Sequence, residues 1–267
     1  MRGLARGDGC GGGAVRRLAA IAVLSGLAVL AGPARADLII PSGGVTSLAN
    51  GALDLGCTDL IVGGTLHVDA AVVSNIRNVA IQPGGILDAG AGSLGVGGNW
   101  SNSGTFSAGT SVVAFGDACS TGTATISGST SFYDVSFVTS TAKTWAFAVG
   151  STQTIVHLLT IQGTAANPLQ FISTAPGQVA FINLTGAQNI IHVGVTDVWA
   201  TGEWLAPFLT NEGGGGNANR WFGVPFIPPI PASSPAGLLL LVLLLSAAFA
   251  RAGSRRLRHE GNQGSPQ

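Results

Sequence analysis

The chain has 267 residues, of which 41 are Gly, and only 9% are charged, against about a quarter in ordinary soluble domains. Its formal net charge of zero averages unlike parts: basic residues crowd both ends, whereas 37–223 holds three basic residues and ten acids, a net charge of 3 − 10 = −7. Such an acidic, lysine-poor middle lacks the positive surface that phosphate backbones attract, which excludes nucleic acid as an expected partner.

The first 36 residues follow the pattern of an export signal. Two arginines at 16–17 precede an apolar run of 15 residues, 18–32, and Ala34 and Ala36 stand at −3 and −1 of a cleavage site. A membrane anchor is the alternative, but such a run spans roughly 22 Å of a hydrocarbon core about 30 Å thick. We therefore predict a signal helix used by Sec-type export machinery and removed by signal peptidase, so that the mature chain starts at Asp37.

Short strand candidates follow one another through 37–223, and Gly-Gly, Asn-Gly, Pro-Gly or Ser-Gly pairs separate them. They are 59–62, 65–68, 79–81, 93–96, 111–115, 124–126, 132–137, 144–148, 154–158, 169–172, 179–182 and 190–193. No segment in this region keeps a helical period over three turns. The pattern predicts an all-β ectodomain.

A solenoid is favoured over a sandwich because the strands are short and similar units recur. Residues 55–66 and 81–87 each contain a strand, then Gly-Gly, then a new apolar start. We expect a right-handed parallel β-helix in which each turn buries its inward side chains against its neighbours. A β-sandwich is the alternative.

The segment 97–115 reads Gly-Gly-Asn-Trp-Ser-Asn-Ser-Gly-Thr-Phe followed by an apolar strand, and 124–135 reads Ala-Thr-Ile-Ser-Gly-Ser-Thr-Ser-Phe-Tyr-Asp-Val. Together they resemble a repeat of bacterial surface β-helix proteins. The later segments 194–202 and 221–223 resemble the closing unit of such proteins. The resemblance implies a fold and a surface location, and it brings no catalytic residues.

Two cysteines remain after the predicted signal is removed, since Cys10 lies inside it. Cys57 and Cys119 form an even pair in an oxidising compartment, which favours a disulfide that closes a loop of about 60 residues. Two buried thiols are the alternative.

Other chemistry-bearing residues suggest ordinary roles. The histidines stand singly, without a partner at metal-ligand spacing: His67, His157 and His192. Four acids near glycine corners, Asp54, Asp59, Asp69 and Asp88, lack a calcium-loop motif. Asp134 and Asp197 are the candidates for an acid–base pair in a polysaccharide-degrading β-helix. The five tryptophans suit the core or a cap better than a sugar-binding face. We expect no catalytic, cofactor or metal site.

The C-terminal tail has four parts. A Pro-rich spacer, 224–235, precedes the charge-free apolar stretch 236–250, which predicts a hydrophobic helix in the inner membrane. An arginine cluster follows within 236–258, and 259–267 is expected to be a disordered end. The cluster, which keeps its side of the membrane cytoplasmic, consists of Arg251, Arg255, Arg256 and Arg258.

This order resembles the sorting tails that exosortase-type membrane proteases process, in particular the type named for Ile-Pro-Thr-Leu followed by Ser-x-Trp-Gly. Four positions match at the same spacing: Ile230, Pro231, Ser234 and Gly237. Ala232, Ser233 and Ala236 stand where Thr, Leu and Trp are expected. The Pro-Glu-Pro type and a plain membrane anchor are the alternatives.

The sequence therefore predicts an exported, non-enzymatic structural or adhesion protein. It would be anchored transiently in the inner membrane and would end at the cell surface or in the extracellular matrix. A polysaccharide-binding or polysaccharide-degrading β-helix protein, with a surface polysaccharide as partner, is the alternative function.

Overall fold

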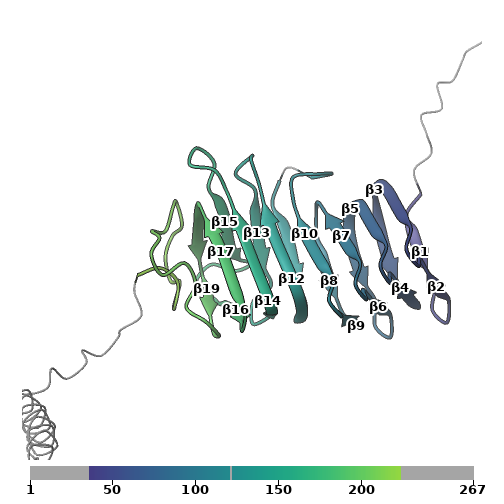
Figure 1. Cartoon of the computed structure of the whole chain (residues 1–267). Coiled ribbons are helices and arrows are strands. Elements are labelled where there is room, and N and C mark those ends of the chain that lie inside the picture. Colours follow the sequence, from purple (N-terminus) through teal and green to yellow (C-terminus); the bar gives the residue numbers. More distant parts are fainter. Residues whose placement is uncertain (1–35, 121, 224–267) are drawn as a thin grey trace, which may run out of the picture. The chain divides into compact units, whose positions relative to one another are not determined.

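The computed structural model describes residues 36–120 and 122–223, which form nineteen strands and no helix (Figure 1). Every ladder between these strands is parallel. The fold is a parallel β-solenoid of about seven turns. The antiparallel ladders of a β-sandwich do not occur in the described part, so that alternative is wrong. The expected signal helix and C-terminal hydrophobic helix lie outside the described residues.

Each turn contributes strand segments to three faces. The first face stacks eight segments: β1 (Leu38–Ile40), the ends of β3 (Ala52–Val62) and β5 (Val72–Ile81), then β8 (Trp100–Asn102), β11 (Ala124–Ser127), β13 (Thr144–Phe147), β15 (Leu169–Ser173) and β18 (Val193–Thr196). Paired residues on this face are 19 to 26 positions apart, for example 79 − 60 = 19 and 126 − 100 = 26. That spacing is the length of one turn.

The second face begins as a separate four-stranded sheet, and the third is continuous with the first. The second holds β2 (Val45–Ser47), β4 (Thr65–His67), β6 (Ile86–Asp88) and β9 (Thr105–Ser107), then the beginnings of β12 (Thr130–Val138) and β14 (Thr152–Gln162), β16 (Ala180–Leu184) and β19 (Val198–Ala200). The third holds the beginnings of β3 and β5, then β7 (Ser93–Val96), β10 (Val112–Phe115), the ends of β12 and β14, and β17 (Ala187–Ile191). Register shifts mark where β3, β5 and β12 turn a corner.

A column of glycines forms the corner between the first and second faces. Thr65, Ile86 and Thr105 each donate a backbone N–H to the glycine of the preceding turn. A Cβ added to Gly85 would lie 2.1 Å from the Val62 carbonyl oxygen, so no larger residue fits between these turns. The column consists of Gly44, Gly64, Gly85 and Gly104. The recurrent Gly-Gly pairs of the sequence are thus corners where backbones of successive turns touch.

The core changes from aliphatic to aromatic along the solenoid. Leu60 and Val79 fill the inward column of the first face in the early turns, and the next residue of that column is Trp100. Its ring lies edge-on to Phe106, with the ring centroids 5.1 Å apart. The later core holds Phe115, Phe132, Phe137, Trp145, Phe147 and Phe171. These large rings fill the interior of the later turns and pack against one another.

Residues 203–223 close the C-terminal end of the solenoid. Leu205 and Trp221 form an isolated parallel bridge, and both side chains are buried. The Trp221 ring packs edge-on against Phe171, the last ring of the aromatic core, at 6.1 Å. The segment therefore caps the core.

Candidate functional site

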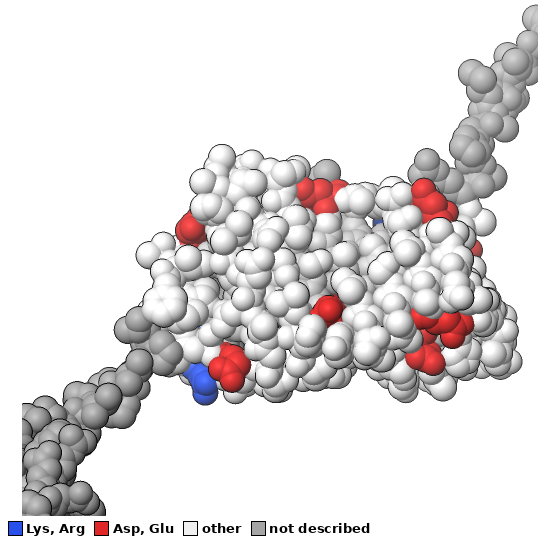
Figure 2. Space-filling model, in the orientation of Figure 1, with Lys and Arg blue, Asp and Glu red and all other residues white. Residues whose placement is uncertain are grey.

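The carboxylates of the described part bond mainly to the neighbouring turn. Nine of its ten acids have a side-chain hydrogen bond to a residue 18 to 24 positions away, which is the length of one turn. The nine are Asp37, Asp54, Asp59, Asp69, Asp88, Asp117, Asp134, Asp197 and Glu212. On the face drawn in Figure 2, the acidic side chains lie in several groups on a surface that is otherwise almost uncharged. These acids therefore join neighbouring turns of the solenoid.

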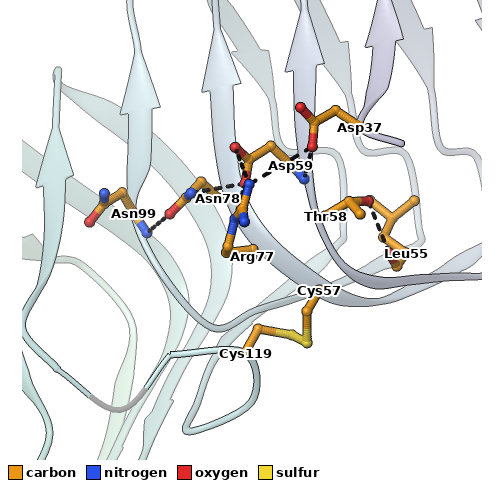
Figure 3. A network of polar contacts seen from close by, with 9 residues as sticks. All are labelled: Asp37, Leu55, Cys57, Thr58, Asp59, Arg77, Asn78, Asn99 and Cys119. Atoms are coloured by element: carbon orange, nitrogen blue, oxygen red, sulfur yellow. Dashed lines mark hydrogen bonds and ion pairs between the residues drawn. A yellow bond between two sulfur atoms is a disulfide. The ribbon is translucent and has the colours of Figure 1, made fainter. Parts of the chain in front are cut away.

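One such set forms a polar ladder along the corner that leads into the first face (Figure 3). The Asp37 carboxylate accepts the backbone N–H of Asp59 at 2.9 Å, and Asp59 accepts the side-chain amide of Asn78 at 2.8 Å. Asn78 and Asn99 each accept a backbone N–H from the next turn at 2.8 Å. The ladder thus ties successive turns together outside the core.

Arg77 completes this ladder by binding Asp59 through two nitrogens, at 2.8 and 3.0 Å. These bonds hold the pKa of the Asp59 carboxyl below its usual value. The same carboxylate holds the pKa of Arg77 above its ordinary value. Asp37 lies 3.9 Å from the guanidinium and adds a weaker attraction.

The predicted disulfide is confirmed: Cys57 and Cys119 are bonded, with their Cα atoms 5.1 Å apart. Three turns separate the two residues along the solenoid, a rise of about 14 Å at ~4.8 Å per turn. Residues 116–120, here called the fold-back loop, close that gap by reaching from the end of β10 toward the N-terminal end (Figure 1). The loop lies on Gly97, where an added Cβ would be 1.4 Å from the Ala118 carbonyl oxygen.

Lys143, which is the single lysine of the chain, holds the root of the same loop. Its side chain is 1% exposed, and its ammonium donates to the carbonyl oxygens of Gly97, Gly116 and Ser120. Burial lowers the pKa of this amine, and the nearby Asp117 carboxylate opposes that shift. Because an ammonium group has three N–H donors, these three carbonyl oxygens satisfy all of them.

Asp117 anchors the loop from the other side of its root. Burial alone would raise the pKa of its carboxyl, but donors from Thr139, Ser140 and Thr141 outweigh that effect and lower it. The Thr139 hydroxyl donates at 2.6 Å and the Ser140 backbone N–H at 2.8 Å. The fold-back loop is therefore held by a disulfide, an ammonium and a carboxylate.

Each histidine of the described part pairs with an acid of an adjacent turn. His67 lies 3.0 Å from Asp88, and His157 lies 2.6 Å from Asp134. His192 lies 3.0 Å from Glu212. Among residues 36–120 and 122–223, no three His, Cys, Asp or Glu side chains converge as a metal site would require.

Asp134 and Asp197 have separate partners. Asp134 bonds His157, whose ring stacks on Tyr133 at 4.7 Å. Asp197 accepts from Asn217 at 2.6 Å and from a backbone N–H at 2.8 Å, and these bonds lower the pKa of its carboxyl. No interaction joins the two acids.

A hollow lies between β17 and the cap. It has a volume of about 370 Å³ and is lined by 188–190 and 206–209. The Phe208 ring at its rim is 84% exposed. Of the five tryptophans, Trp100, Trp145 and Trp221 are buried in the core or cap as expected, whereas Trp199 and Trp204 are half-buried.

Several predicted site residues lie outside the described part. They are the signal residue Ala34, the sorting motif 230–237 and the arginines of 251–258. Ala36 and Asp37, by contrast, are the first two described residues. No described helix is long and apolar enough to span a membrane. Sequence reasoning missed Lys143, the polar ladder and the hollow. The recurrence of Asp, Asn and Arg at intervals of about 20 residues is the signal that predicts the ladder.

Comparisons with protein-family models, curated proteins and solved structures returned no match.

Proposed function

We propose that this chain is an exported, non-enzymatic structural or adhesion protein of the cell surface or extracellular matrix. The observation that carries the proposal is the use of nine acids out of ten to bond one turn to the next. A glycoside hydrolase built on this fold would need two carboxylates that are free to exchange protons with a substrate in one groove. Here the same groups serve the stacking of the solenoid, which suits a durable surface element.

Export and sorting complete the proposal. Signal peptidase cuts after Ala36, and an exosortase-type protease cuts near 230–237. Between these cuts lies the solenoid, whose coil is right-handed, as nearly all parallel crossover connections are. Until the second cut, the apolar stretch 236–250 holds the chain in the inner membrane and the arginines stop it from slipping through. The disulfide supports an oxidising final location.

The test is to map both termini of the surface-exposed form by mass spectrometry. We expect an N-terminus at Asp37 and a C-terminus within 230–237. Removing 236–267 should release protein into the periplasm and abolish surface display. A surface form that still ends at Gln267 would show that the tail is a simple anchor, and retention of 18–32 would refute the cleaved signal.

A second function, binding of a surface polysaccharide, is supported by the hollow beside the cap. It combines an exposed aromatic ring with amide groups, the usual components of a sugar-binding surface.

A further inference from the structure

The hollow exists because the cap stands away from the last strand of the third face. β17 pairs with β14 along one edge, and the position of a following strand is taken by the segment 204–206. That segment is held through the Gln188 side chain, whose amide donates to the Trp204 carbonyl oxygen and accepts the Ala206 backbone N–H, both at 2.8 Å. A side-chain bridge is longer than a backbone ladder, so space remains beside the strand.

The free edge of β17 supplies backbone groups to this space. Thr185 and Ile191 bond β14 through their backbones, so by strand alternation Gln188 and Ile190 turn their N–H and C=O groups toward the cap. No backbone hydrogen bond from a described residue reaches these groups from the cap side. The floor of the hollow therefore offers both donors and acceptors.

The remaining lining is neutral and partly apolar. Asn189 is exposed, and its side-chain amide has no hydrogen bond within the described chain. Phe208 presents an open ring face, and no acid or base lines the hollow. Its volume of about 370 Å³ falls in the range of small-molecule sites. A ligand that fits has one apolar face, several hydroxyl groups and no charge.

We propose that this hollow binds a pyranose ring of a neutral polysaccharide. The Phe208 ring stacks on the C–H face of the sugar, and the Asn189 amide and the edge of β17 bond its hydroxyls. The net charge of −7 over 37–223 disfavours an anionic polymer. This inference rests on the second function proposed above, and it names the substrate class and the residues.

Binding is measured by titrating the full-length protein in detergent with cellohexaose and maltohexaose, following tryptophan fluorescence, because Trp204 adjoins the hollow. Polygalacturonate and an extended Val-Thr hexapeptide are titrated alongside. We expect saturable binding of at least one neutral oligosaccharide. Phe208→Ala and Asn189→Ala should each weaken it, the former by about tenfold, since both side chains are exposed and their loss leaves the fold intact.

The matched control is Val156→Ala, which trims a side chain 45% exposed on β14 outside the lining and should leave binding unchanged. Equal affinities for the wild type and Phe208→Ala would overturn the proposal. So would absence of neutral-saccharide binding at millimolar concentration, or binding of the hexapeptide alone. This assay uses purified protein, so its outcome is independent of export. The protein could bind no saccharide and still have the termini and surface display of the export proposal. It could equally bind a saccharide and lack them.

Discussion

Lys143 and Cys119 hold the same loop to the solenoid by different means. The ammonium binds the carbonyl oxygens of Gly116 and Ser120 at its root, and the sulfur joins its tip to Cys57, three turns back. One bond is covalent and depends on redox conditions, whereas the other depends on a charge kept away from water.

Replacing both Cys57 and Cys119 by Ser should lower the free energy of unfolding by up to about 4 kcal/mol, since the bond closes a loop with a sequence separation of 62. Guanidinium unfolding followed by circular dichroism measures the loss. Reductant should destabilise the wild type by a similar amount and leave the double variant unaffected. The prediction would be contradicted if reductant converts both cysteines to thiols but leaves the guanidinium midpoint of the wild type unchanged.

Lys143→Met keeps the apolar stem but removes the ammonium, leaving three carbonyl groups without their donor. We expect a loss of about 3 kcal/mol or more in the free energy of unfolding. Faster proteolysis within 116–120 should accompany it. Arg220→Met is the matched control, since this exposed cation binds a single carbonyl at the cap and should cost under about 1 kcal/mol. Equal losses in the two variants would refute the role of Lys143.

Gly85→Ala should cost about 1–3 kcal/mol, because its Cβ would lie 2.1 Å from the backbone oxygen of Val62 and push two turns apart. Gly122→Ala is the control, since no atom lies within 4 Å of the added methyl group. Thermal unfolding compares the two variants. If the two variants have the same thermal unfolding midpoint, the column of corner glycines does not constrain the spacing of the turns.

The Asp59–Arg77 pair should make the solenoid sensitive to acid. Because the pKa of Asp59 is lower in the folded chain, the stability from this pair is present above the unfolded value of about 3.9 and is lost as the pH falls through the folded value. The pair is partly exposed and screened by solvent, so the effect on the free energy of unfolding should be small.

The measurement compares the free energy of unfolding at about pH 6 and about pH 3 for the wild type and Asp59→Asn. The variant should lose less stability on acidification. Glu203→Gln, which changes an exposed acid without a side-chain hydrogen bond in the described part, should behave like the wild type. The prediction fails if Asp59→Asn retains the full acid dependence.

The all-β solenoid was predictable because apolar alternation and glycine corners are local signals. The strand 93–96 matches β7, and the Gly-Gly pairs lie at the expected corners. The short strands β8 and β9 were missed, because Trp100–Asn102 and Thr105–Ser107 carry too few apolar residues to show alternation. Residues 190–193 were predicted as one strand, but His192, with φ +50°, turns a corner between β17 and β18.

The contacts between distant turns could not be predicted in the same way. A cysteine pair suggested the disulfide, but nothing local shows that residues 116–120 fold back along three turns to reach Cys57. The lysine likewise resembles a surface residue in sequence, and only the stacking of Gly97 and Gly116 around it creates the buried site. Such features depend on the register of turns, which emerges after the coil has formed.

The burial of Lys143 leaves the side chains of this protein without an accessible primary amine, because the chain contains no other lysine. Amine-directed dyes and aldehyde fixatives should therefore react with the chain terminus alone while the coil is folded. Trypsin-like proteases cleave after Lys or Arg, and the remaining basic residues of 37–223 are Arg77 and Arg220. The Arg77 side chain is already bound by Asp59. A layer built of this protein would resist cross-linking and digestion through its composition as well as through its stability.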